Sequence, residues 1–327
     1  MVRPRDRLPG LLVLVAVALV ASGVGALAPM VSPLAVSILL GALVANTVGL
    51  PGIARPGVAL HPLLLETGIV LLGASFPLGA LLGSGLTVVA LAAATVAFAV
   101  AFAELLSRGV FDLDERTGST LAGGLAICGV SAAAAVAGAI DTDDSALAYV
   151  AGTVLLFDAV TLVLFPLVGH AVGLGGREFG IWAGLAMFST GPVAAAGFAY
   201  GPAAGKWATL TKLVRNAFIG VVALGYAVAY GERGDASVRG FVWTRFPKFL
   251  LGFAVVAAVA NAGVLTAANV DVLSRVADWL FALAFAGLGF DLDVREMRDA
   301  GVRPVVLAAV HLVVVAALAY VAVTLLA

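Results

Sequence analysis

The stretch "TLTKLVRN", residues 209–216, places a lysine and an arginine three residues apart inside an otherwise apolar segment. If this segment is helical, Lys212, Arg215 and Asn216 share one face, because they stand at i, i+3 and i+4. A charge at the centre of a bilayer costs at least about 2.5 kcal/mol on insertion scales, so such side chains face a cavity or a partner. The rest of the chain must therefore supply that partner.

The composition identifies the solvent that surrounds this helix. The chain has 327 residues, of which 62% are hydrophobic and 11% are charged, and its mean hydropathy is +1.14. Soluble domains carry about 25% charged residues. The apolar runs are continuous and long enough to span a bilayer as helices, without the alternation of an outer-membrane barrel. We therefore expect an all-α polytopic protein that crosses the cell membrane of a prokaryote several times.

Several other classes of protein are disfavoured by the composition. The net charge is −1 and no long basic tract is present, so nucleic acid is not an expected partner. One cysteine and three widely separated histidines offer no spacing typical of metal ligands, and we expect neither a metal nor a cofactor. Cys128 has no histidine nearby in its span, so an intramembrane enzyme is disfavoured. The lipid bilayer is the expected surrounding, and assembly of identical copies is compatible with the sequence.

Apolar segments of membrane-spanning length recur along the whole chain and predict one transmembrane domain over residues 1–327. We expect eleven spans near residues 8–28, 33–50, 61–83, 85–106, 116–139, 145–169, 178–200, 204–230, 247–268, 273–292 and 301–326. The longest polar linker is residues 231–248.

The distribution of Lys and Arg predicts the orientation of these spans. Of the 18 cationic residues, 14 fall in segments on the same side as the N-terminus, and only Lys206 and Arg275 fall on the other side. Cytoplasmic segments carry the excess of Lys and Arg, so the N-terminus is expected inside and the C-terminus outside. Lys212 and Arg215 are the remaining two cations, and they lie within a span.

The first 28 residues fit two interpretations. They begin with three arginines, continue with an apolar run and end with Ala-Leu-Ala before Pro29. This is the pattern of a retained first helix, and also that of a cleaved signal peptide. Cleavage would leave ten spans in the same orientation.

An internal repeat is expected from two similar stretches. "GASFPL" (73–78) and the helix after it resemble "GLGFDL" (287–292) and the helix after it. The two pairs of spans, 61–106 and 276–326, have opposite parity, so the copies would be inverted in the membrane, as in many transporters. The alternative is a chance similarity between helices rich in Ala, Gly and Leu.

Two spans carry signals that interrupt a helix, over residues 116–139 and 178–200. The first reads "AICGVSAAAAVAGAI" at 126–140, and the second reads "AMFSTGPVAAAGFAY" at 186–200. We expect Pro192 and Gly191 to break the second helix, because proline lacks an N–H and clashes with the preceding turn. A new half-helix then begins with free N–H groups, which attract anions. The alternative is that these glycines only allow close helix packing.

Of the acids within the predicted spans, Asp158 and Glu66 could balance the cations. Asp158 is near the middle of the sixth span, where it could pair with Lys212 or Arg215. One acid cannot neutralise both cations, and an anionic substrate would cancel the charge left over. Glu66 lies one turn inside the third span, where it could carry a coupling charge or reach the membrane surface.

The order of the motifs "LAICGVSAAAA", "VLLFDAVTLVLFPL", "GIWAGLAMFSTGPVAAAGFAYG" and "TLTKLVRNAF" resembles the YeiH family of prokaryotic membrane proteins. The resemblance covers nearly the whole chain and implies a sulfate exporter. It also implies an inverted-repeat transporter fold with a core and a panel domain, as in the bile-acid/sodium symporter group. This chain departs from the family in lacking a His-Asp pair in the seventh span and in carrying Asp158 where a small or hydroxyl residue is usual.

These observations predict a secondary transporter that moves a small anion, such as sulfate or an organosulfonate, by alternating access. Because no nucleotide-binding loop is present, H⁺ or Na⁺ would be the coupling ion. The alternatives are a sodium-coupled organic-acid symporter and a non-transporting membrane sensor or scaffold. The predicted substrate-binding residues are Lys212, Arg215, Asn216, Cys128, Gly129, Ser131, Ser189, Thr190 and Gly191, and the predicted coupling or charge-compensating residues are Asp158 and Glu66.

Overall fold

A computed structural model describes residues 3–27, 32–76, 78–231, 238–292 and 302–326, and every regular element in these ranges is helical. The chain divides into two compact units. Unit 1 contains Met1–Leu82 and Lys248–Val294, and unit 2 contains Gly83–Pro247 and Arg295–Ala327. The chain thus passes from one unit to the other three times.

Seven helices in the described residues are long and apolar enough to cross a membrane. They cover Arg5–Leu27, Arg55–Ser75, Gly85–Gly109, Asp144–Ala171, Pro202–Ala229, Ala267–Asp291 and Val302–Leu326. The other four predicted spans are two shorter apolar helices, Pro33–Thr47 and Phe249–Asn261, and the two segments expected to be interrupted. The multi-pass helical class is confirmed, whereas eleven crossings and their orientation stay a prediction.

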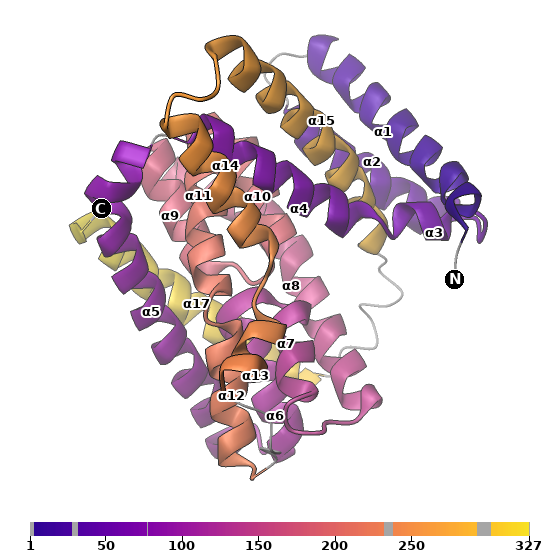
Figure 1. Cartoon of the computed structure of the whole chain (residues 1–327). Coiled ribbons are helices and arrows are strands. Elements are labelled where there is room, and N and C mark those ends of the chain that lie inside the picture. Colours follow the sequence, from indigo (N-terminus) through magenta and orange to yellow (C-terminus); the bar gives the residue numbers. More distant parts are fainter. Residues whose placement is uncertain (1–2, 28–31, 77, 232–237, 293–301, 327) are drawn as a thin grey trace. The chain divides into compact units, whose positions relative to one another are not determined.

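Unit 1 is built around α15, which packs against α1, α2 and α4 (Figure 1). Its elements are η1 (Pro4–Arg7), α1 (Leu8–Leu27), α2 (Pro33–Thr47), α3 (Arg55–Val58), α4 (His61–Leu72), η2 (Gly73–Ser75), α14 (Phe249–Asn261) and α15 (Ala267–Asp291). The backbones of α2 and α15 approach closely, since a Cβ at Gly41 would lie 3.0 Å from the Cα of Gly289. Small residues at such interfaces let apolar helices pack without a hydrophobic driving force.

Two asparagines in unit 1 make equivalent hydrogen bonds. Asn46 ends the stretch "ALVAN" (42–46), and Asn261 ends the similar stretch "AAVAN" (257–261). The Nδ2 of Asn46 donates to the carbonyl of Leu292 at 2.7 Å, and that of Asn261 donates to the carbonyl of Phe76 at 2.9 Å. Each accepting residue directly follows a helix of unit 1. The accepting residues, Phe76 and Leu292, lie in the similar stretches "GASFPL" and "GLGFDL", while the inverted repeat of 61–106 by 276–326 stays a prediction.

Unit 2 contains the two interrupted helices and the helix that carries "TLTKLVRN". Its elements are α5 (Leu78–Gly109, which begins in unit 1), α6 (Glu115–Gly123), η3 (Gly124–Cys128), α7 (Val130–Ala137), α8 (Asp144–Ala171), α9 (Gly176–Ala186), α10 (Thr190–Tyr200), α11 (Pro202–Asn216), α12 (Ile219–Ala229), α13 (Val238–Arg245) and α17 (Val302–Leu326). Figure 1 shows α9, α10 and α11 side by side, and α11 packs against both of the others. The core is rich in aromatic contacts, such as the stacking of Phe165 on Trp182.

Polar contacts tie the outer helices of unit 2 together. The indole of Trp182 on α9 donates to the carbonyl of Ala316 on α17 at 2.8 Å. Glu104 on α5 accepts hydrogen bonds from the hydroxyl of Ser119 on α6, at 2.6 Å, and from that of Tyr226 on α12, at 2.7 Å. These contacts satisfy side chains that would otherwise be costly to bury.

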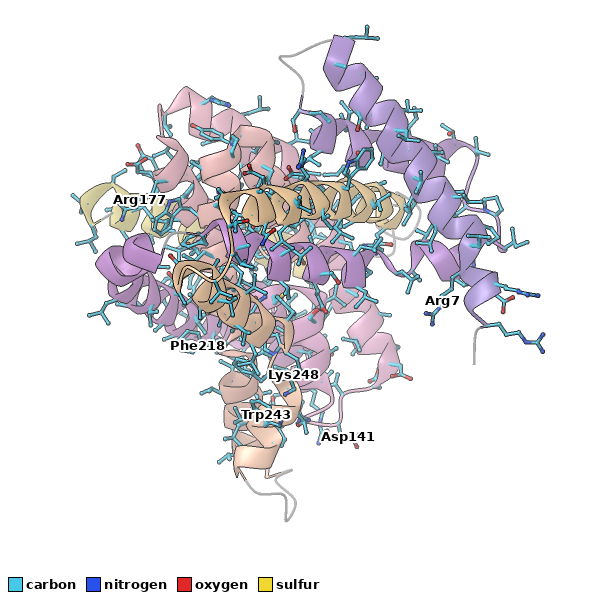
Figure 2. All side chains as sticks on the ribbon, turned by 45° about the horizontal axis from the view of Figure 1, so that its top comes forward. Arg7, Asp141, Arg177, Phe218, Trp243 and Lys248 are labelled. Carbon is cyan, nitrogen blue, oxygen red and sulfur yellow. The ribbon has the colours of Figure 1, made fainter. Side chains whose placement is uncertain are left out.

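The structure differs from the sequence prediction at three places. The third predicted span is shorter than 61–83, because α4 ends at Leu72 and α5 begins at Leu78. The eighth is divided at residues 217–218 into α11 and α12. The predicted linker 231–248 contains the short helix α13, whose exposed Trp243 is labelled in Figure 2. Aromatic and cationic residues on such a helix are typical of a membrane interface.

Candidate functional site

The first interrupted helix breaks at a glycine. After α6, the chain makes one π-helical turn, η3, in which the N–H of Gly129 donates to the carbonyl of Gly124 at 2.9 Å. Gly129 then adopts φ 57° and ψ −133°, a conformation that essentially only glycine tolerates. Helix α7 begins at Val130. The break therefore lies where the sequence predicted it.

The second interrupted helix breaks earlier than predicted. Helix α9 ends at Ala186, Met187 and Ser189 are extended, and α10 begins at Thr190. Pro192 is the third residue of α10, so it lies just after the break, in the first turn of the new half-helix. A proline is tolerated there because the first N–H groups of a helix have no partner within it. Pro192 still contributes, since it offers no N–H to the carbonyl of Phe188.

The two breaks lie against each other. The Sγ of Cys128 is 3.1 Å from the hydroxyl oxygen of Thr190. A Cβ added at Gly129 would collide with the hydroxyl of Ser189 and lie 2.9 Å from Val154. Cys128 and Gly129 of the fifth predicted span therefore lie next to Ser189 and Thr190 of the seventh.

Lys212 and Arg215 hold the carbonyl groups that the breaks leave unpaired. The ammonium of Lys212 donates to the carbonyls of Ile127 at 2.6 Å, Met187 at 2.9 Å and Phe188. Three acceptors match the three donors of an ammonium group. The guanidinium of Arg215 donates to five backbone carbonyls. These are Leu125 at 3.4 Å and Ala126 at 2.5 Å in η3, and Gly184 at 3.1 Å, Leu185 at 2.6 Å and Met187 at 2.9 Å around the end of α9.

This arrangement changes the role that the geometry favours for the two cations. Both side chains are 0% exposed, and most of their donors point at carbonyls of the protein itself. The carbonyls at a helix C-terminus carry partial negative charge, so they compensate a buried cation. The geometry therefore favours a structural role for Lys212 and Arg215, which stabilise both breaks. Direct contact of these two side chains with an anion stays a prediction, and their hydrogen bonds to the protein's own carbonyls speak against it.

Asp158 faces the beginning of α10. Its side chain, on α8, is 2% exposed, and its Oδ1 accepts a hydrogen bond from the backbone N–H of Ser189 at 3.2 Å. Within the described residues, no ion pair of 4 Å or less joins Asp158 to Lys212 or Arg215. The ion pair that the sequence left open for Asp158 is therefore not observed, and the side chain instead caps a half-helix, as acids commonly do at N-termini.

Polar side chains gather at the first turns of the two new half-helices. Ser131 is exposed in the first turn of α7, and Ser189 and Thr190 are half-buried at the start of α10. The Nδ2 of Asn216 donates to the hydroxyl of Thr190 at 2.9 Å, while its Oδ1 is buried and has no hydrogen-bond partner among the described residues. The backbone N–H groups of these first turns also lack intrahelical acceptors.

The remaining predicted residues are distributed as follows. Gly191 is buried in the first turn of α10, beside Thr190, where its N–H is one of these first-turn donors. Glu66 lies half-buried on α4 of unit 1, and the structure does not place it relative to the residues of unit 2. No feature of the sequence indicates that main-chain carbonyls, such as that of Ile127, are the partners of the cations.

Comparison with known proteins identifies relatives along nearly the whole chain. The family model described as "Conserved hypothetical protein 698" matches residues 9–308. A UPF0324 membrane protein of Nitratidesulfovibrio vulgaris is 32% identical over an alignment of 316 positions, which covers 90% of this chain and 87% of the relative. The UPF0324 membrane protein TauZ of Paracoccus denitrificans is 32% identical over an alignment of 255 positions, which covers 75% of this chain and 74% of the relative. No solved structure matches the chain.

These relatives confirm the resemblance to the YeiH family that the motifs indicated. They are bacterial membrane proteins by name, so the prediction of a multi-pass membrane protein is also confirmed. The similarity to the bile-acid/sodium symporter group stays a prediction.

Proposed function

The chain belongs to the UPF0324 family of bacterial membrane proteins, and we propose that it is a secondary transporter for a small oxyanion such as sulfate or an organosulfonate. The single observation that carries this proposal is the contact between two interrupted helices, buried within an apolar unit of several helices. Irregular backbone at membrane depth is tolerated only where it is buried in protein or lines a cavity. Interrupted helices of this kind form the binding sites of many secondary transporters.

The distribution of charge around the breaks supports an anionic substrate. Each helix end carries roughly half an elementary charge, negative at the C-terminus and positive at the N-terminus. The C-termini of η3 and α9 are matched with Lys212 and Arg215. At the N-termini of the new half-helices, α7 has the hydroxyl of Ser131, and α10 has the hydroxyl of Thr190 together with the side chain of Asp158, which accepts the N–H of Ser189. Helix N-termini bind oxyanions through backbone N–H groups.

The proposed anion site therefore consists of the first turns of α7 and α10 with the side chains around them. These side chains are Ser131, Ser189, Thr190, Cys128 and Asn216. Lys212 and Arg215 would act indirectly, by stabilising the interruption of both helices next to the anion site. This is the part of the prediction that the geometry sharpens most.

Alternating access requires two bodies whose arrangement can change, and the division of the chain into two units supports this mechanism. We assign unit 2, which holds both breaks, as the core, and unit 1 as the panel. No further assumption about the placement of the two units is needed for the proposal.

The test is uptake of radiolabelled sulfate and methanesulfonate into proteoliposomes that contain the purified full-length protein. We expect the variant Thr190→Val to reduce uptake at least tenfold, because it removes a hydroxyl from the site at nearly constant volume. Thr324→Val is the matched control, since its hydroxyl only bonds to the carbonyls of Tyr320 and Val321 at the end of α17. Uptake of neither anion above that of empty liposomes would contradict the proposal.

The same liposomes separate the alternatives. A sodium-coupled organic-acid symporter would lose activity when choline replaces Na⁺, and it would accept carboxylates rather than sulfonates. The oxygens of Asp158, Thr190 and the unpartnered Oδ1 of Asn216 are the observation that favours this second candidate, because hard cations prefer oxygen ligands. A sensor or scaffold would bind an anion without moving it.

A further inference from the structure

Asp158 and an incoming oxyanion would compete for the same helix terminus. The carboxylate is buried, and its Oδ1 accepts the N–H of Ser189, the residue just before the first turn of α10. A negative charge held there occupies the positive end of the α10 dipole. An anion that approached the N–H groups of Thr190 and Gly191 would meet this charge at short range.

We propose that Asp158 is the proton-coupling residue of this transporter and that its substrate is a monovalent oxyanion of the sulfonate type. The proposal rests on the proposed function. When Asp158 is deprotonated, its charge satisfies the N-terminus of α10 and excludes the substrate. When Asp158 binds a proton, its side chain is neutral, and one monovalent anion binds in its place at the positive N-terminus of α10. Proton and anion then cross together, and the proton leaves to water on the far side.

The neighbouring charges do not take over this role. The titratable groups beside the same break are Lys212 and Arg215 on α11, Cys128 on η3 and His311 on α17. All three N–H donors of Lys212 can be used by its hydrogen bonds to three backbone carbonyls, and Arg215 is always protonated. Cys128 contacts the hydroxyl of Thr190, away from the Ser189 N–H that Asp158 accepts.

His311 makes its contacts with residues other than Asp158. It is fully buried, its Nε2 lies 3.1 Å from the carbonyl of Ala99, and its ring contacts Phe102 and Phe188. Asp158 is therefore the titratable acid in direct contact with the half-helix, and no cation within 4 Å in the described part of unit 2 fixes its charge.

The charge balance selects the substrate class. In the empty state, the carboxylate of Asp158 supplies one negative charge near α10. In the loaded state, one proton has neutralised that carboxylate, and one monoanion supplies the charge instead, so the total charge of the site is unchanged. A divalent anion with one proton would add a negative charge inside the membrane, which is costly. We therefore expect methanesulfonate to be favoured over sulfate.

The experiment uses the full-length protein in proteoliposomes, with valinomycin and equal K⁺ on both sides to hold the membrane potential at zero. Acidifying the outside by one pH unit should accelerate methanesulfonate uptake by the wild type about tenfold, because one proton accompanies each anion. The variant Asp158→Asn keeps an acceptor oxygen for the N–H of Ser189 but cannot titrate. It should lose the pH effect while still exchanging external for internal methanesulfonate.

The matched control is Asp143→Asn. Asp143 also accepts a backbone N–H at a helix N-terminus, that of Ala146 at 2.8 Å, but it lies exposed at the start of α8. This variant should respond to the pH gradient as the wild type does. A pH response that persists in Asp158→Asn would overturn the assignment of the coupling residue.

A second measurement does not depend on any variant. A pH-sensitive dye trapped inside the liposomes should report one proton entering for each methanesulfonate, and a K⁺ diffusion potential should leave the uptake rate unchanged. Uptake without proton entry, or uptake that requires Na⁺, would overturn this inference while leaving the protein a transporter. Absence of any anion flux under all gradients would instead reject the proposed function.

Discussion

The two interrupted helices of unit 2 reach the same result by different backbone routes. In the first, a π-helical turn ends at Gly129, whose positive φ redirects the chain. In the second, Met187 and Ser189 are simply extended, and the first turn of α10 contains a proline. Both routes leave carbonyls that cannot be paired within a helix, and both sets converge on the same two side chains of α11. The two breaks therefore share the compensation of their exposed carbonyl ends by Lys212 and Arg215, whereas they differ in local backbone geometry.

The breaks differ in what faces their new N-termini. Asp158 accepts the N–H of Ser189 before α10, whereas Ser131 at the start of α7 is an exposed hydroxyl. One half-helix thus begins against an internal anion, and the other begins with a neutral donor. In the mechanism that we propose, this asymmetry would place coupling at the second break and leave the first as a fixed part of the anion site.

The largest expected effect tests what the two breaks share. Arg215→Met would remove a donor from five buried carbonyls of the two breaks, of which that of Met187 would keep its hydrogen bond from Lys212. Breaking a buried charged network on one side costs about 3–5 kcal/mol, so we expect little folded protein. Thermal unfolding in detergent and size-exclusion chromatography measure this loss.

Arg215→Lys is the informative companion to this variant. It keeps the charge but not the planar fork of donors, so it should recover only part of the stability. An Arg215→Met protein as stable as the wild type would show that the carbonyls find other donors, and the common support of both breaks would be wrong.

The next largest effect is expected from a substitution at Gly129, which affects the backbone of the first break directly. Gly129→Ala adds a Cβ against Ser189 and Val154 in a conformation that other residues rarely adopt. Such backbone strain costs about 1–3 kcal/mol before the collision is counted. Gly173→Ala is the control, because Gly173 also has a positive φ of 72° but has open space around its Cβ position. A smaller loss of thermal stability for Gly129→Ala than for Gly173→Ala would contradict this account.

The smallest effect is expected at the second break. Pro192→Ala restores an N–H opposite the carbonyl of Phe188, but that carbonyl already accepts from Lys212. Since Pro192 lies in the first turn of α10, we expect a change in the free energy of unfolding of at most about 1 kcal/mol and nearly unchanged anion uptake. Loss of transport with retained stability would mean that the missing N–H of Pro192, rather than Lys212, keeps this helix open.

Much of the site was predictable from the sequence. Helical spacing placed Lys212 and Asn216 on one face, and Asn216 does reach Thr190 of the second break. The glycine at the first break was identifiable because only glycine tolerates its conformation. The position of the second break was not, because a proline is compatible with both the interior of a kinked helix and the first turn of a new one.

Composition and hydropathy by themselves determined that this chain is a helical membrane protein, because so many apolar side chains can only be solvated by lipid. They also determined that two cations lie within a span. Only the tertiary structure decided what those cations contact. Every residue has a main-chain carbonyl, so the sequence does not indicate which carbonyls accept hydrogen bonds from Lys212 and Arg215. These partners are defined only when the fold brings two interrupted helices from distant parts of the chain together.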